Sequence, residues 1–149
     1  MATRSAIAIK HGDVIKAVYC HWDGYLEHNG TILQECYSDS VKLNQLIALG
    51  DISSLGASIG QAHSFDARWT EEDYVKIGDK CLAAPETTFY GRDRGEKNVG
   101  FRTFVTEKAF VEFYNGLDYF YLYDHGVWYV KEYDRDFQPL HEALEGVTE

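Results

Sequence analysis

Two short segments hold most of the side chains that could recognise or transform a ligand. The first reads YCHWDGY and covers residues 19–25, where Trp22 and Tyr25 offer flat aromatic surfaces beside the carboxylate of Asp23. A nucleobase can stack on such rings, and a carboxylate accepts hydrogen bonds from a ribose hydroxyl or an exocyclic amine. The alternative is that Trp22 belongs to the core and that Asp23-Gly24 is only a turn.

The second segment, RDRGE at residues 92–96, places two arginines two residues apart in a chain that is otherwise acidic. In an extended segment Arg92 and Arg94 would project to the same side, and guanidinium groups bind phosphate oxygens in pairs. The alternative is a solvated turn in which Asp93 and Glu96 simply pair with these arginines.

Histidines supply the remaining candidates. His63 and Phe65 lie in the segment HSFD at residues 63–66, and His21 follows Cys20 at the end of an expected strand. Neighbouring residues of a strand point to opposite faces, so Cys20 and His21 cannot act as a nucleophile and its base. The histidines show no metal-ligand spacing, and the common signatures of nucleotide-binding loops, serine hydrolases and zinc proteases are missing, so we expect neither a metal nor a cofactor.

The elements that must position these residues indicate an α+β fold. Alternating and β-branched residues predict hairpins over 5–10 with 14–21 and over 119–123 with 127–130, while helical spacing predicts two helices within 29–49 and one over 106–114. Further strands are expected at 87–91 and 100–104, and a last helix at 139–145. The region 51–73 has no periodicity but keeps apolar residues, which predicts an ordered, ligand-facing loop. We therefore expect mostly antiparallel strands, about five in number, with helices on one face.

Length and composition limit the classes of protein. A chain of 149 residues with 45% hydrophobic and 26% charged residues is typical of a single globular domain covering residues 1–149. The formal net charge of −10, with 4 basic and 10 acidic side chains in residues 101–149, disfavours DNA and anionic membranes as default partners. Three widely spaced cysteines and the absence of a signal-like apolar run predict reduced thiols and a cytoplasmic protein.

Several of these segments resemble a family of small proteins encoded by tailed phages and prophages. The resemblance runs over about residues 1–130 and rests on the words CHWDGY at 20–25, LIALGDISSLG at 46–56, HSFD at 63–66 and YGRDRGE at 90–96. It implies expression in the cytoplasm of an infected bacterial host, and it carries no catalytic residues with it. Phage proteins of this size include sponges that sequester cyclic-nucleotide or ADP-ribose-type immune signals without cleaving them.

The sequence thus predicts a homo-oligomeric anti-defence protein that binds a small phosphorylated, nucleotide-type ligand. Phosphates would meet Arg92 and Arg94, with Arg4 as a third cation, and the base would lie against Trp22 or Tyr25. This hypothesis requires those side chains to converge in the fold. Two alternatives stay open: a signal-degrading phosphodiesterase or hydrolase that uses His21 or His63 as general acid or base, and an inhibitor whose acidic surface occupies a nucleic-acid-binding host protein.

Overall fold

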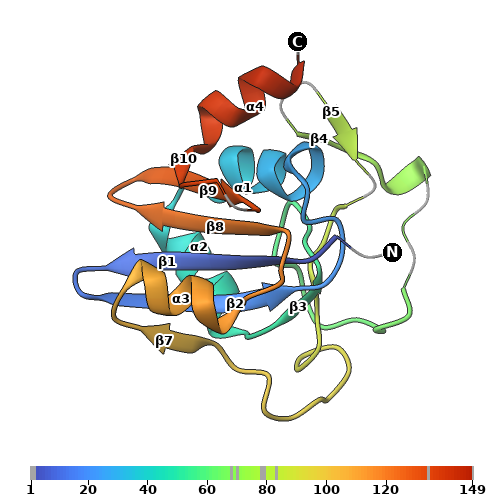
Figure 1. The fold of residues 1–149 in the computed structure, drawn as a ribbon. Coiled ribbons are helices and arrows are strands. Elements are labelled where there is room, and N and C mark those ends of the chain that lie inside the picture. Colours follow the sequence, from blue (N-terminus) through green and yellow to red (C-terminus); the bar gives the residue numbers. More distant parts are fainter. Residues whose placement is uncertain are drawn as a thin grey trace.

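An eight-stranded mixed sheet forms the centre of the protein (Figure 1). The computed structural model describes residues 3–67, 69, 71–77, 80–82, 84–133 and 135–148. The strands run in the order β10-β9-β8-β1-β2-β3-β6, and β7 also pairs with β2. Their bounds are β1 (Ser5–His11), β2 (Val14–Cys20), β3 (Ile52–Ser54), β6 (Thr88–Phe89), β7 (Arg102–Phe104), β8 (Tyr119–Asp124), β9 (Val127–Glu132) and β10 (Gln138–Pro139).

The two long hairpins agree with the sequence prediction. β1 pairs antiparallel with β2, and β8 pairs antiparallel with β9. The turn of the second hairpin holds His125 at φ 50° and Gly126 at φ 79°, the left-handed conformation that two-residue turns of this kind require. The hairpins then join through a parallel pairing of β1 with β8, and β2 pairs in parallel with β3, so the sheet is mixed.

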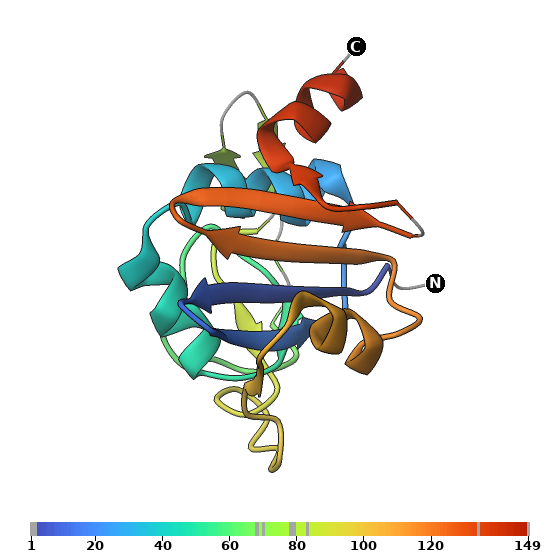
Figure 2. The same cartoon turned by 60° about the vertical axis from the view of Figure 1, so that its left-hand side comes forward.

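Helices cover both faces of the sheet rather than one, which corrects the sequence prediction. In β1, Ile7 and Ile9 point to the face that packs against the helices η1 (Leu26–Gly30), α1 (Thr31–Cys36), α2 (Ser40–Ala48) and α4 (Leu140–Thr148). Ala6 and Ala8 point to the opposite face, where their small side chains leave room for α3 (Glu107–Phe113) and Phe110. Figures 1 and 2 show α3 alone in front of the sheet, with α1 and α2 behind it.

Polar side chains cap the first turns of two of these helices. The carboxylate of Asp39 accepts from the main-chain N–H of Val41 at the start of α2, and the hydroxyl of Thr106 accepts from the N–H of Ala109 at the start of α3. Gly50 follows α2 at φ +89°, and a Cβ there would clash with the carbonyl oxygen of Val99. Both the conformation and the close approach require glycine at this position.

The region expected to be a loop, residues 51–73, contains strand β3 and the short helix η2 (Glu71–Asp73). A small hairpin of β4 (Val75–Ile77) and β5 (Lys80–Leu82) follows it, outside the main sheet. The prediction of about five strands missed these elements because strands of two or three residues are too short to show a hydrophobic period. The class, α+β, is as predicted.

Candidate functional site

An aromatic cavity of about 310 Å³ opens beside β3, at the end of the sheet where β2 stops. Two indoles and a phenyl ring face it, together with three hydroxyl groups, and none of the described lining residues carries a charge. The lining consists of Trp22, Ser53, Ser54, Phe65, Ala67, Trp69 and Thr88. We call this set the aromatic cavity, and its mixture of flat rings and hydroxyls suits a planar polar ligand.

An irregularity in strand pairing explains why two consecutive serines line one cavity. Ile52 of β3 pairs with Phe89 of β6, and Ser54 pairs with Thr88, so Ser53 is an extra residue in β3. In a regular strand Ser53 and Ser54 would point to opposite faces, whereas such an irregularity redirects a side chain. Within the described part of the chain the hydroxyl of Ser54 forms no hydrogen bond, so it is available to a ligand.

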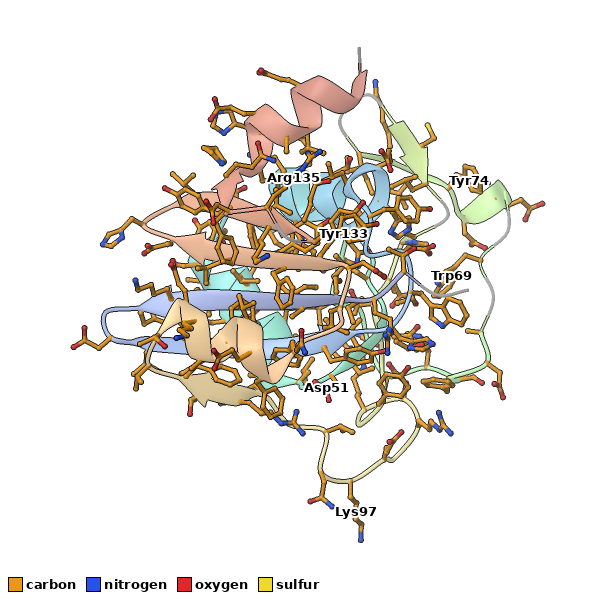
Figure 3. All side chains as sticks on the ribbon, in the orientation of Figure 1. Asp51, Trp69, Tyr74, Lys97, Tyr133 and Arg135 are labelled. Atoms are coloured by element: carbon orange, nitrogen blue, oxygen red, sulfur yellow. The ribbon has the colours of Figure 1, made fainter. Side chains whose placement is uncertain are left out.

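The outer wall of the cavity comes from the segment after β3. Figure 3 shows Trp69 on this outlying segment with its indole directed toward the body of the molecule. The ring of His63 lies 5.6 Å from that of Trp69, and its Nε2 is 2.9 Å from the Thr88 hydroxyl. Phe65 packs at 5.6 Å against the ring of Tyr90. His63 and Phe65, both predicted as site residues, therefore belong to this wall.

The guanidinium of Arg92, predicted to bind phosphate, is engaged within the protein. Its five N–H groups are all used: Nε and Nη2 donate to the carboxylate of Asp93, Nη1 donates to the carbonyls of Ile59 and Gly60, and Nη2 also donates to the carbonyl of Thr87. The side chain is only 14% exposed. No donor is left for a phosphate group.

Asp93, the partner of Arg92, is fully buried and ties the wall to the sheet. Its carboxylate also accepts from the main-chain N–H groups of His63 and Phe89. Burial by itself would raise the pKa of Asp93, but the hydrogen bonds from Arg92 and from these two N–H groups outweigh it and hold the pKa below its usual value. We call this pair the Arg92–Asp93 junction, and it positions the residues that lead into the wall.

Arg94 is the guanidinium at the rim. Its Cζ lies 5.1 Å from the centre of the Phe65 ring and 6.0 Å from that of Tyr90, and 56% of the side chain is exposed. The single ion pair that it forms among the described residues, with Glu96, is 3.9 Å long and half exposed, an arrangement that contributes little. Arg94 is therefore free to turn toward an anion above Phe65.

The first predicted segment divides between the cavity and its surroundings. Trp22 lines the cavity and is 45% exposed, and the ring of His21 packs edge-on against it at 4.7 Å. Nδ1 of His21 lies 2.6 Å from the hydroxyl of Tyr19. Burial raises the pKa of Tyr19, and the nearby guanidinium of Arg4 opposes this rise. Arg4 and His21 thus lie beside Tyr19, outside the residues that line the cavity.

Asp23 and Tyr25 lie outside the lining, contrary to the expected convergence. Asp23 has φ 57° and contacts His28 at 3.9 Å, and the Tyr25 ring packs at 6.2 Å against the same histidine. The left-handed backbone at Asp23 fits the turn that was the alternative reading of this segment. The fold therefore brings together Trp22, His63, Phe65 and Arg94 of the predicted set, and leaves out Asp23, Tyr25 and Arg92.

Cys20 is a structural residue. It is fully buried; its thiol donates to the carbonyl of Trp22, and the side-chain amide of Asn29 lies 3.3 Å from the sulfur. Burial raises the pKa of Cys20 to about 12, so the thiolate that a nucleophile needs does not form near neutral pH.

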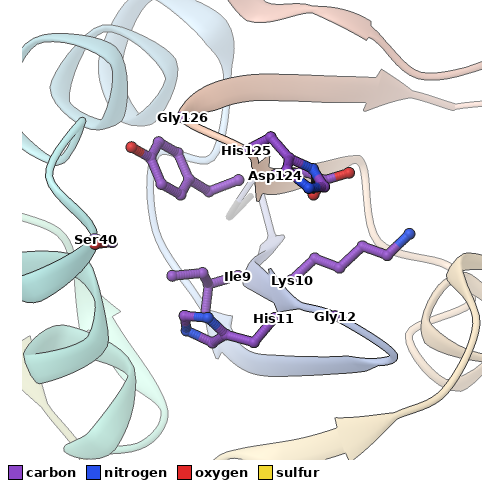
Figure 4. A pocket seen from close by; sticks show the side chains of 9 residues that line it. Ile9, Lys10, His11, Gly12, Ser40, Asp124, His125 and Gly126 are labelled. Carbon is purple, nitrogen blue, oxygen red and sulfur yellow. Dashed lines mark ion pairs between the residues drawn. The ribbon is translucent and has the colours of Figure 1, made fainter.

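A second hollow of about 410 Å³ lies between the two hairpin turns and the start of α2 (Figure 4). The side chains that could bind a ligand there are engaged or directed elsewhere. The His11 ring pairs with Asn44, Nδ1 of His125 lies 2.6 Å from the carboxylate of Asp124, and Lys10 points away from α2. The aromatic cavity is therefore the stronger candidate.

Comparison of the chain with protein-family models, curated proteins and solved structures finds no match. Among the residues that the structure describes, no group of three histidine, cysteine or acidic side chains is placed to hold a metal ion. Nor does any described helix combine the length and the apolar character needed to cross a bilayer.

Five lining residues were not among the predicted site residues: Ser53, Ser54, Ala67, Trp69 and Thr88. The region 51–73 was predicted to be ordered and to face a ligand, and Trp69 lies within this region. The hydroxyl groups carried no comparable signal, because only the irregular pairing of β3 with β6 turns them to one cavity.

Proposed function

We propose that the protein binds a small nucleotide-derived molecule in the aromatic cavity and sequesters it without turnover, as an anti-defence sponge of the phage type would. The observation that carries the proposal is the convergence of Trp22, Phe65 and Trp69 on one uncharged cavity with Arg94 at its rim. Stacking a base on an aromatic side chain contributes about 1–3 kcal/mol. A guanidinium adds charge-assisted hydrogen bonds to a phosphate.

The exposure of Trp22 supports a binding role for this cavity. Its indole is 45% exposed, although it lies next to the buried end of β2. A ligand that covers the ring would remove apolar surface from water, which stabilises the complex by about 25 cal/mol per Å² buried. Nanomolar affinity requires about 12 kcal/mol in total, and several stacked rings with one cation can contribute a large part of it.

Ligand retention tests the proposal. The purified protein is incubated with cyclic mononucleotides, cyclic dinucleotides and ADP-ribose, desalted and heat-denatured, and the released material is identified by mass spectrometry. We expect intact ligand from the wild type and from Tyr133→Ala, and a loss of at least about fivefold in Trp69→Ala, which corresponds to the lower end of the stacking energy of one base. Tyr133 is a matched control because it is an exposed aromatic residue next to β9, four strands from β3. No retained ligand, or full retention by Trp69→Ala, would contradict the proposal.

A signal-degrading enzyme is the second candidate, because His21 is held by Tyr19 at 2.6 Å next to the cavity wall. An imidazole oriented by a hydroxyl can serve as a general acid or base. Recovery of a cleaved product in the same experiment, abolished by His21→Gln, would favour this candidate over sequestration.

The homo-oligomer is also a proposal. Val105 follows β7 and is 75% exposed, and Phe113, the last residue of α3, is 53% exposed. Clusters of exposed apolar residues are typical of interfaces. Light scattering of the purified protein measures the subunit number, and Val105→Asp would lower it if this surface joins the copies.

A further inference from the structure

The aromatic cavity suits the uncharged part of a ligand and leaves the anionic part outside it. The described residues of its lining, from Trp22 to Thr88, offer rings and hydroxyl groups but no charge. Burying a phosphate there would leave the anion without a cationic partner, which is costly. A base or another uncharged ring suits the interior, and any anionic group of the ligand must stay at the rim.

Among the residues that the structure describes, the rim offers one cation. Arg94 lies over Phe65, while Arg92 two residues earlier has no free donor. Arg4, the other predicted cation, interacts with the phenol of Tyr19 rather than with a residue of the lining. One guanidinium matches one phosphate group, because two N–H donors along one edge of the planar group pair with two oxygens of a single anion.

The size of the cavity limits the number of rings. At about 310 Å³ it lies at the lower end of the range for small-molecule pockets, about 300–1,000 Å³. Its aromatic residues, Trp22, Phe65 and Trp69, line one hollow rather than two. A ligand with two bases would leave the second base in solvent.

We infer that the cavity selects a mononucleotide, that is, a ligand with one base and one phosphate group that Arg94 binds. This inference rests on the proposed function and narrows it, since cyclic dinucleotides carry two bases and ADP-ribose carries two phosphates. The base enters between the indoles, the hydroxyls of Ser53 and Ser54 face its polar edge or the ribose, and the phosphate stays above Phe65.

Titration followed by tryptophan fluorescence tests the inference, because two of the three tryptophans line the cavity. The probes are the monophosphates of the four common nucleosides, the nucleosides themselves, ADP-ribose and cyclic di-AMP. We expect at least one monophosphate to bind about tenfold or more tightly than its nucleoside, because hydrogen bonds to charged groups are the stronger ones. ADP-ribose and cyclic di-AMP should bind more weakly than that monophosphate.

Two variants identify the cation. Arg94→Gln should reduce monophosphate affinity to that of the nucleoside and leave nucleoside affinity unchanged. Lys108→Gln removes the same charge from an exposed position on α3 and should change neither affinity. Both arginine and lysine are exposed, so neither change threatens folding.

The possible failures are distinguishable. Binding of ADP-ribose or cyclic di-AMP as tight as that of the best monophosphate, or monophosphate binding that Arg94→Gln leaves intact, would overturn the inference while the proposed function stands. If none of the probes binds, the proposed function fails with it.

Discussion

Arg92 and Arg94 stand two residues apart in one turn, yet their surroundings have opposite character. Arg92 donates to four partners and is 14% exposed, whereas Arg94 is 56% exposed and lies over an aromatic ring. Arg92 joins two segments of the chain, whereas Arg94 lies at the rim of the aromatic cavity. The difference arises because three main-chain carbonyls and a buried carboxylate converge around Arg92 and none around Arg94.

This contrast shows what decides the role of an arginine. Carbonyl groups at a turn need donors when they are withdrawn from water, and a guanidinium supplies five of them at once. The carbonyls of Ile59, Gly60 and Thr87 accept from these donors, so the guanidinium of Arg92 has its partners inside the protein. The neighbouring Arg94 keeps its donors, and a ligand can use them.

The largest expected effect separates the two arginines by stability. Arg92→Ala leaves the carboxylate of Asp93 buried without its cation and should lower the free energy of unfolding by about 3–5 kcal/mol. Arg94→Ala should change it by less than about 0.5 kcal/mol, as exposed substitutions do. Urea unfolding followed by circular dichroism measures both. Equal losses of unfolding free energy in the two variants would contradict the different roles assigned to Arg92 and Arg94.

The hairpins, the capped helices and the α+β class could be predicted from the sequence because each rests on local patterns. The different surroundings of Arg92 and Arg94 could not be predicted. A spacing of two residues places both side chains on one side only in a regular strand. Here the segment turns: the main-chain N–H of Asp93 donates to the carbonyl of Phe89, and that of Gly95 donates to the carbonyl of Gly91. Two of the three carbonyls that accept from Arg92, those of Ile59 and Gly60, also come from a segment 32 to 33 residues earlier.

A smaller effect concerns how the wall is held at His63. Thr88→Val keeps the shape of the side chain but removes the hydroxyl 2.9 Å from Nε2 of His63. We expect a loss of about 0.5–1.5 kcal/mol in stability, the net worth of one hydrogen bond. Ligand affinity should fall as well, because the histidine packs against Trp69. The control Thr103→Val, on the exposed edge strand β7, should leave affinity unchanged.

The smallest effect is a difference in acid response between two buried aspartates. The pKa of Asp93 is lowered by folding, so its ionised form contributes stability above the unfolded pKa of about 3.9, and this contribution is lost as the pH falls through the folded value. Burial raises the pKa of Asp51, so its ionisation opposes folding and protonation in acid relieves that cost.

Unfolding measured from pH 6 down to pH 2 should therefore show opposite changes in the two asparagine variants. Asp93→Asn should flatten the loss of stability in acid, and Asp51→Asn should steepen it. A parallel change in both variants would contradict the assignment of these two environments.

The most direct test of the aromatic cavity uses the three tryptophans as reporters. In protein labelled with 5-fluorotryptophan, fluorine NMR gives one resonance each for Trp22, Trp69 and Trp128, assigned with single Phe variants. Trp128 is 2% exposed and donates to the carbonyl of Tyr37 inside the core, so it serves as an internal control. Adding the mononucleotide that binds best should shift the resonances of Trp22 and Trp69 and leave that of Trp128 in place. Unchanged resonances of Trp22 and Trp69 at saturating ligand would contradict the account.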